Sequence, residues 1–187
     1  RFNWDSPILI SPHDSSRLYF ASQRVWRSDN RGDAWRAISP DLTRNQDRLL
    51  TPMMGRQWSV DSNWDLYAMS VFNSITSLSE SPLVEGLLYA GTDDGIIQVS
   101  EDGGQNWRQI GKLPGAPENY FVNDIKADLH NPDGVYVLVD NHKAGDFRPF
   151  IYMSTNRGKS WKSIAGDLPE RHLAWRLVQD HVKPELL

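Results

Sequence analysis

One short pattern occurs three times in this chain of 187 residues, and it constrains the fold more than any other feature. Each copy reads Ser-x-(Asp/Asn)-x-Gly-x-x-Trp. Self-similarity of this kind is the signature of a chain built from repeated structural units. The residues at the fixed positions are Ser28, Asn30, Gly32 and Trp35, then Ser100, Asp102, Gly104 and Trp107, then Ser154, Asn156, Gly158 and Trp161.

Each copy of the pattern predicts a β-hairpin. Runs of β-branched and aromatic residues precede the copies, and a short apolar stretch that begins at the Trp follows each of them. Within the turn, an Asp or Asn side chain accepts hydrogen bonds from backbone N–H groups two residues further on, and a Ser hydroxyl does so more weakly. Glycine supplies a left-handed backbone conformation. The Trp covers the turn and has one N–H to satisfy, so we expect strand, turn and strand.

The repeated unit is longer than this hairpin. A strand, a proline-containing turn and a second strand precede each copy, for example at 75–82 and 86–91. Four antiparallel strands per unit predict an all-β fold, a β-propeller segment in which each unit is one blade. The expected parts are blade 1 at about 7–39, a top-face insertion at about 39–69, blade 2 at about 70–112, blade 3 at about 120–166 and the start of blade 4 at about 173–187.

This segment of about three and a half blades does not close a ring by itself, because propellers usually contain about four to eight blades. An open arc leaves apolar faces and strand edges unpaired. Two interpretations follow: the chain is a fragment of a longer propeller, or two copies associate to close the ring. The start at Arg1 and the end at Leu187, inside an expected strand, favour the fragment.

The repeated pattern resembles the Asp-box, or BNR repeat, of sialidases, xyloglucanase-type glycoside hydrolases, sortilin-type receptors and photosystem II assembly factors. Asn30 and Asn156 stand where that family has Asp, and Ala34 stands where Ser or Thr is usual. The resemblance implies a propeller whose boxes join the third and fourth strands of each blade, away from the active face. The chain also resembles large bacterial tandem-propeller proteins, which implies an extracellular or periplasmic location.

Composition excludes several classes of function. The net charge is −4 and the pI is about 5.7, so neither nucleic acid nor an acidic membrane is an expected partner. No stretch approaches the roughly 18 apolar residues that span a bilayer. Cysteine is absent, which excludes disulfides, thiolate metal sites and cysteine nucleophiles, and argues against a sortilin ectodomain. We predict no cofactor, and no ligand spacing is specific enough to predict a metal.

Two long segments on the expected top face are the candidates for a ligand site. The interval between the first two boxes is longer than the next one, which places an insertion at about 39–69. The other segment joins the second and third strands of blade 3, at 140–149. Long loops are often functional. The candidate ligand-binding residues are Arg56, Trp58, Asp61, Trp64 and Asp65 in the insertion, and Asp140, His142, Asp146 and Arg148 in the blade 3 loop.

Each candidate also has a purely structural interpretation. Trp58 and Trp64 either stack on sugar rings or pack the insertion onto the blades. His142 either forms an acid–base or metal cluster with the neighbouring aspartates, or is solvated beside aspartates that stabilise the turn. Residues 93–95, Asp-Asp-Gly, are expected to form a tight hairpin turn rather than a functional pair of carboxylates.

No catalytic motif can be assigned residue by residue. A glycosidase needs two carboxyl groups about 5–10 Å apart, and the top face offers Asp61, Asp65, Glu118, Asp140 and Asp146. A sialidase would also use three arginines, for which Arg56, Arg148 and Arg171 are available. We therefore expect a binding module for carbohydrate or protein, completed by further blades or a second copy. The alternatives are part of a xyloglucanase-like or sialidase-like hydrolase, and an intracellular assembly factor.

Overall fold

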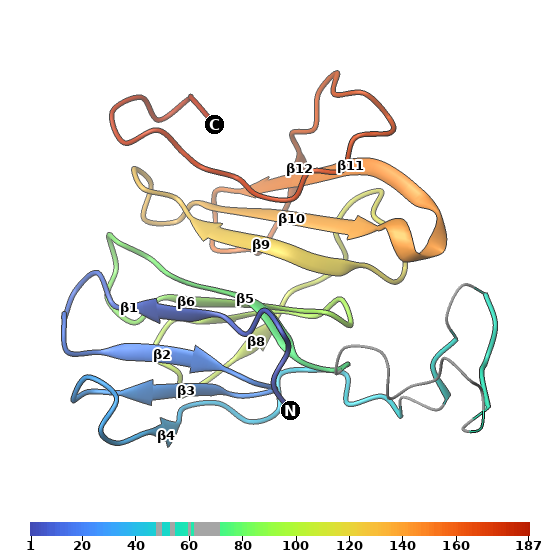
Figure 1. Cartoon of the computed structure of the whole chain (residues 1–187). Helices are drawn as coiled ribbons and strands as arrows, with labels where there is room; N and C mark the ends of the chain where they lie inside the picture. The colour runs from blue at the N-terminus through green and yellow to red at the C-terminus, as the bar shows by residue number, and fades with distance from the viewer. Residues whose placement is uncertain (48–49, 53–54, 60, 62–71) are drawn as a thin grey trace.

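A computed structural model describes residues 1–187 except 48–49, 53–54, 60 and 62–71, and it contains three four-stranded antiparallel sheets (Figure 1). Blade 1 consists of β1 (Ile8–Ile10), β2 (Leu18–Ala21), β3 (Val25–Ser28) and β4 (Arg36–Ala37). Blade 2 consists of β5 (Ile75–Glu80), β6 (Leu88–Thr92), β7 (Ile97–Ser100) and β8 (Arg108–Gln109). Blade 3 consists of β9 (Phe121–Ala127), β10 (Val135–Asn141), β11 (Asp146–Ser154) and β12 (Lys162–Ser163).

Strand order confirms the predicted all-β propeller segment. In every sheet each strand pairs with the next one along the chain. The innermost strands are β1, β5 and β9, and β5 contacts both of the others. The boxes and the first turns of the blades therefore lie on one face, which we call the box face. The loops between second and third strands lie on the other, the top face, together with the connections between blades.

The hairpins of the three boxes share one set of hydrogen bonds. The Ser hydroxyl accepts the N–H of the box Gly at 2.8, 2.8 and 2.9 Å, and the Asn or Asp Oδ1 accepts an N–H at 2.9 Å in each copy. The latter bond reaches four residues along the chain, not the predicted two. The reason is that two consecutive residues are left-handed, for example Arg31 at φ 60° and Gly32 at φ 98°.

The boxes also join neighbouring blades. The Trp107 indole N–H lies 3.1 Å from both the Gly104 carbonyl of its own box and the Ile38 carbonyl at the end of blade 1. Gly104 lies against the same carbonyl, so closely that a Cβ on it would be 2.7 Å from the Ile38 oxygen. Box two is therefore part of the interface between blades 1 and 2 as well as a turn.

Short polar side chains of β5 connect the inner strands of blades 2 and 3. The Ser77 hydroxyl accepts the Ile125 N–H at 2.9 Å, and the Thr76 hydroxyl donates to the Val122 carbonyl at 2.7 Å. Asp124 of β9 does the same for the next unit, because its carboxylate accepts the Leu177 N–H at 3.2 Å. The buried polar residues of the inner strands thus hold successive units together.

Residues at about 173–187 were expected to begin a fourth blade, and their first turn is formed. The Asp180 N–H donates to the Leu186 carbonyl at 2.9 Å, as the Ser81 N–H does to the Leu87 carbonyl in blade 2. No strand is assigned from Ile164 to Leu187. A strand requires a ladder partner, and in the other blades that partner is the following strand, which these residues do not contain.

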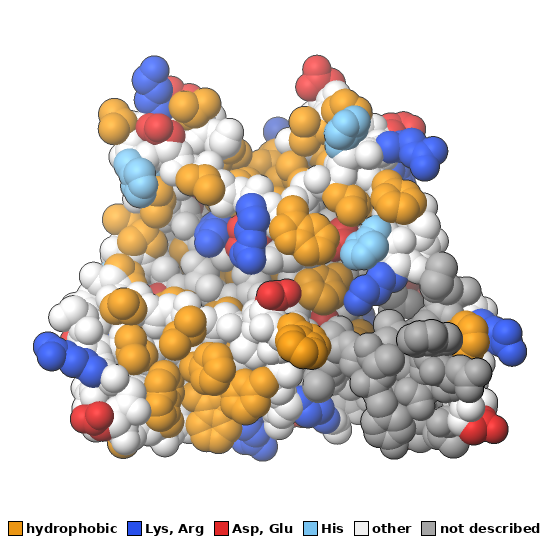
Figure 2. Space-filling view, viewed as in Figure 1, with side chains coloured by type: hydrophobic (Ala, Val, Ile, Leu, Met, Phe, Trp, Pro, Cys, Tyr) orange, Lys and Arg blue, Asp and Glu red, His pale blue; other side chains and the backbone are white. Residues whose placement is uncertain are grey.

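The side of blade 1 that faces away from blade 2 exposes apolar side chains. Ile8 and Ile10 are each 65% exposed, and Phe2 and Trp35 are also exposed. Figure 2 shows hydrophobic side chains gathered over the strands of this blade. In blades 2 and 3 the corresponding side is buried against the preceding blade, for example by Leu88 against blade 1 and by Val135 against blade 2. Blade 1 therefore presents an interface of the kind that is buried elsewhere in the chain.

A tyrosine occupies the second position of β2, β6 and β10, and two of the three bond to the next unit. The Tyr19 hydroxyl donates to Glu80 at 3.1 Å. The Tyr136 hydroxyl donates to Asp128 at 3.1 Å and lies 3.4 Å from the Gln179 amide. Glu80 and Gln179 both directly precede the first turn of the following unit.

The third tyrosine, Tyr89, is fully buried and its hydroxyl has no partner in the described part of the chain. The corresponding position of the next unit holds Ala127, which has no polar side chain. A buried hydroxyl without a hydrogen bond costs about 1–3 kcal/mol. One alanine in the repeat thus explains an unsatisfied group in the core.

We predict that Tyr89→Phe leaves the free energy of unfolding unchanged or raises it by up to about 1 kcal/mol, since it removes an unbonded hydroxyl. Tyr136→Phe is the matched control and is expected to lower that free energy by about 1–2 kcal/mol. Urea denaturation of the two variants measures both values. Equal losses in the two variants would contradict the assignment of the repeat positions.

Candidate functional site

The insertion after blade 1 is closed at its base by one asparagine. Asn73 accepts the Gln46 N–H through Oδ1 and donates from Nδ2 to the Gln46 carbonyl, both at 2.8 Å. Its backbone is left-handed, at φ 59°. The two ends of the insertion are therefore held side by side at the top face.

Candidate residues in the insertion are described only in part. The Arg56 guanidinium lies over the Trp58 ring, 4.8 Å from its centroid, and Trp58 is 36% exposed. Asp61 accepts the Ser59 hydroxyl at 2.5 Å, which holds the pKa of that carboxyl below its usual value. Trp64 and Asp65 lie outside the described residues.

The turn at 93–95 is confirmed as a tight turn, with Gly95 at φ 80°, but its two carboxylates are also buried. Asp94 accepts the Arg44 N–H at 2.8 Å. Asp93 accepts both the N–H and the hydroxyl of Ser74, at 2.8 and 2.7 Å. These bonds attach the base of the insertion to blade 2, so the pair has a structural role that the turn pattern did not predict.

Burial raises the pKa values of both carboxyl groups of this pair. Removal from water raises the pKa of Asp93 to about 6 and also raises that of Asp94, while the hydrogen bonds from Ser74 and Thr92 act in the opposite direction. Both groups are buried and bonded within the fold. They are therefore poor candidates for contact with a ligand.

The blade 3 loop contains a histidine held by a buried aspartate. The loop leaves β10 at Asn141, makes a short 3-10 helix, η2 (His142–Ala144), and turns at the left-handed Gly145. Asp140 is 1% exposed, and its Oδ1 bonds both to the His142 ring at Nδ1 and to the His142 N–H. Asp146 does not join this pair, so the predicted cluster of two aspartates and one histidine is reduced to Asp140 and His142.

Asp146 instead pairs with Arg148. The Arg148 Nε and Nη2 donate to the two Asp146 oxygens at 3.0 and 2.7 Å. This hydrogen bonding holds the pKa of Asp146 below its usual value. Arg148 also lies over the Phe150 ring, 5.1 Å from its centroid. The arginine is thus fixed in position at the edge of the sheet.

A hollow of about 290 Å³ opens beside this pair. The connection after β12 contributes Arg171, whose guanidinium lies 5.9 Å from the ring centroid of Phe147. Phe147 is 40% exposed. The lining residues are Gly145, Asp146, Phe147, Arg148, Glu170 and Arg171. We call the hollow together with residues 140–148 and 170–176 the blade 3 loop site.

Trp175, in the same site, was not among the predicted residues. It is 50% exposed, and its ring centroid lies 6.2 Å from that of His142 (52° between the planes). A signal was present in the sequence. Aligned on the first turn of each unit, Trp175 stands where blades 2 and 3 have the small polar residues Thr76 and Asn123.

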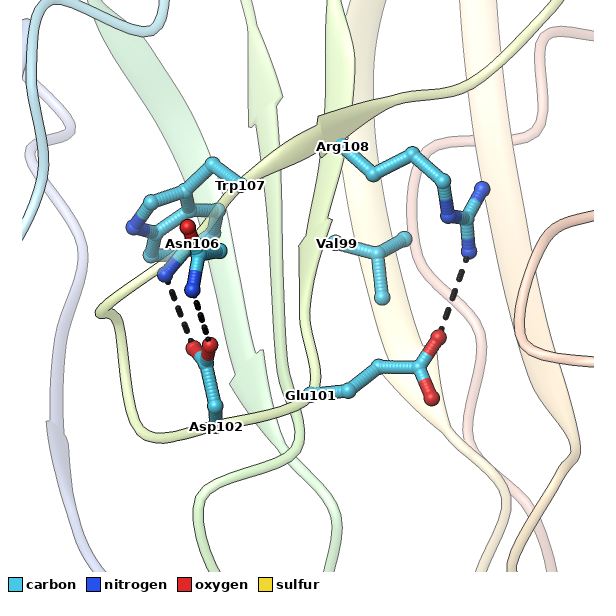
Figure 3. Close-up of a pocket in the computed structure, with 6 residues that line it drawn as sticks. All are labelled: Val99, Glu101, Asp102, Asn106, Trp107 and Arg108. Carbon is cyan, nitrogen blue, oxygen red and sulfur yellow. Dashed lines mark hydrogen bonds and ion pairs between the residues drawn. The ribbon is translucent and has the colours of Figure 1, made fainter.

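A second hollow, of about 220 Å³, lies at box two (Figure 3). There Asp102 accepts two hydrogen bonds from Asn106, at 2.9 and 2.7 Å, and Glu101 pairs with Arg108 at 3.7 Å. Each of these charged side chains is thus bonded to a neighbour within the hollow, and the hollow lies on the box face. We assign it a structural role.

Metal sites and membrane-spanning helices are the other features considered for the described residues. Within the described ranges, no group of three or more His, Asp or Glu side chains could hold a metal ion. None of the described helices is long and apolar enough to cross a membrane.

Comparisons with known proteins point to one architecture. Residues 151–164 match the BNR-Asp box repeat family. An oligoxyloglucan-reducing end-specific xyloglucanase from Emericella nidulans is 27% identical over 161 residues, which are 85% of this chain and 17% of that protein. YCF48 from Cyanidioschyzon merolae is similar in structure, with a TM-score of 0.51 and 16% identity over 83% of this chain and 38% of that one.

A GH74 xyloglucanase from Xanthomonas campestris matches 86% of this chain and 30% of its own, with a TM-score of 0.39 and 16% identity. The chain thus spans less than half the length of each of these relatives.

Proposed function

Because the chain is a segment of an Asp-box repeat β-propeller, we propose that it is a binding module that holds a carbohydrate or protein ligand at the blade 3 loop site. Further blades, from a longer chain or a second copy, complete the ring against the exposed apolar side of blade 1. We further propose an extracellular or periplasmic location, where a carbohydrate ligand would be met.

The observation that carries this proposal is the hollow beside residues 145–148. Ligand sites combine apolar and aromatic surface with a few fixed polar groups. Here the exposed Phe147 ring supplies the apolar surface, and the Asp146–Arg148 pair supplies donors and acceptors in a fixed geometry. Arg171 closes one side of the hollow.

Part of a glycoside hydrolase is the alternative function, favoured by the similarity to the Emericella nidulans xyloglucanase. Such an enzyme needs a carboxyl group with a raised pKa as general acid, beside a second carboxylate. The pKa of Asp146, in the hollow, is lowered instead, and the Asp93 carboxyl, whose pKa is raised, is buried and bonded to Ser74. Glu170 also lines the hollow, so a cleavage assay has to decide between the two functions.

Calorimetric titration of the chain with xyloglucan oligosaccharides tests the proposal. We expect Phe147→Ala and Arg171→Ala each to weaken binding at least about tenfold, which corresponds to about 1.4 kcal/mol. Arg36→Ala is the control, since that arginine is exposed in β4 of blade 1, and it is expected to change nothing.

Three outcomes would count against the proposal. A wild-type chain that does not bind the oligosaccharides would exclude them as the ligand of this site. Affinity that both top-face variants leave unchanged would place the ligand elsewhere. Chain-dependent cleavage of the oligosaccharides would favour the hydrolase.

A further inference from the structure

The pairing of Asp140 with His142 defines which nitrogen of the imidazole faces outward. The Asp140 carboxylate is buried and accepts from the ring at Nδ1, so Nδ1 carries the proton in the neutral ring. The other nitrogen, Nε2, is then an acceptor. It has no hydrogen bond among the described residues, and 35% of the His142 side chain is exposed.

The indole of Trp175 lies beside this imidazole and is anchored from below. The Leu177 N–H, two residues further on, bonds to Asp124 at 3.2 Å, and Arg176 reaches the same carboxylate at 3.4 Å. Half of the Trp175 side chain nevertheless remains exposed, and its indole N–H has no partner in the part of the chain that is described. A large apolar ring with a free donor thus stands next to a fixed acceptor.

Buried polar atoms at the same end of blade 3 lack partners. Asp140 is in register with Phe121 on the neighbouring strand, and Asn123 lies in the irregular step of that pairing. Among the described residues, the Asp140 Oδ2 and both amide atoms of Asn123 are buried without a hydrogen bond. Such atoms in native proteins are usually satisfied by ordered water or a bound group.

The charged groups that surround the pair each face another group of the chain. Lys143 lies over the Phe121 ring, 5.5 Å from its centroid. Arg176 faces Asp124, and Asp140 is taken up by His142. With both carboxylates paired, the surface offers a ligand the Trp175 indole and the His142 Nε2, which suits a molecule with an apolar face and hydroxyl groups.

We propose that Trp175 and His142 form a subsite for one sugar ring of a neutral oligosaccharide. The apolar face of the sugar stacks on the indole, and the His142 Nε2 accepts a hydrogen bond from a sugar hydroxyl. Asp140 is a positioning residue, because it acts only through the orientation and tautomer of the imidazole. This inference rests on the proposed binding function and assigns it a specific contact next to the Phe147 hollow.

Binding of xyloglucan oligosaccharides by variants of the chain tests the subsite. Trp175→Ala and His142→Ala are each expected to weaken affinity at least about tenfold. Val178→Ala is the matched control, because Val178 is 75% exposed in the same segment, and it is expected to leave affinity within about twofold. Thermal unfolding of all three variants identifies any that fail to fold.

Two substitutions of Asp140 test whether it positions the His142 ring. Asp140→Asn keeps an acceptor oxygen for the imidazole and is expected to retain most of the affinity, whereas Asp140→Ala is expected to match His142→Ala. Nitrogen-15 NMR of the His142 ring should show the Nδ1-protonated tautomer in the wild type and in Asp140→Asn, and its loss in Asp140→Ala.

The outcomes separate this inference from the function on which it rests. Wild-type binding that persists within twofold in both Trp175→Ala and His142→Ala overturns the subsite and leaves the binding function intact. Wild-type chain that binds no oligosaccharide overturns the carbohydrate function and the subsite together. A His142 ring protonated at Nε2 in the wild type overturns the role given to Asp140.

Discussion

Replacing Gly104 with alanine is expected to lower the free energy of unfolding by about 3–4 kcal/mol, the largest effect among the three box glycines. Gly104 has φ +96°, which costs an alanine about 1–2 kcal/mol. In addition, its Cβ would lie 2.7 Å from the Ile38 carbonyl oxygen of blade 1. The atom contacted is a backbone oxygen, which cannot move without shifting the strand end to which it belongs.

The other two boxes provide a graded comparison for this prediction. A Cβ at Gly158 would meet side chains at 3.2 Å, and one at Gly32 would meet nothing nearer than 3.7 Å. We therefore expect the losses to fall in the order Gly104, Gly158, Gly32, with about 1–2 kcal/mol for Gly32→Ala from its backbone alone. Gly111→Ala, in open space, is the control. Equal losses in the three boxes, measured by urea denaturation, would show that box two is not part of the blade interface.

Asp93→Asn is expected to stabilise the chain at neutral pH and not at pH 4. Burial raises the pKa of Asp93 to about 6, whereas an unfolded aspartate titrates near 3.8. The folded state therefore binds a proton more tightly than the unfolded state. The stability that this proton contributes is complete below about pH 4 and is lost as the pH rises through about 6. The difference is about 3 kcal/mol.

Asparagine keeps the Ser74 N–H bond and carries no charge, but it loses the oxygen that accepts from the Ser74 hydroxyl and the Asn3 amide. The free energy of unfolding of the variant relative to the wild type should therefore rise by a margin that widens from pH 4 to pH 7. Chemical denaturation across this range measures the margin. Asp102→Asn is the matched control, because boxes one and three already contain Asn at that position. Hydrogen bonds from Asn106 lower the pKa of Asp102. The free energy of unfolding of Asp102→Asn relative to the wild type should therefore fall, and not rise, as the pH increases. A margin that does not change with pH for Asp93→Asn would contradict the raised pKa.

The repeated units were predictable because their signals are local. Turn residues such as Gly32 and Trp35 act within a few residues of chain, and the alternation of apolar positions defines the strands around them. The interfaces between units were harder to predict. That Ala127 leaves Tyr89 without a partner, or that Gly104 faces Ile38, depends on residues that lie far apart in the sequence and meet only when the blades stack.

In the candidate site, too, the local element was predictable and the contacts between side chains were not. The blade 3 loop was located from its place between two strands, and His142 lies in it, whereas Arg148, predicted in the loop at 140–149, belongs to β11. Which aspartate each residue bonds to was not predictable, since Asp140 and Asp146 flank the loop at similar distances along the chain. Burial decided the outcome: Asp140 points into the fold and holds the histidine, whereas Asp146 lies at the surface and pairs with the arginine.

Hydrogen exchange of the chain with and without xyloglucan oligosaccharides is the most direct test of ligand binding at the blade 3 loop site. We expect slower exchange of backbone amides at 140–148 and 170–176 when the ligand is present, with no change in the three boxes. Protection confined to the box face, or no protection in a chain that binds the oligosaccharide, would contradict the assignment of this site.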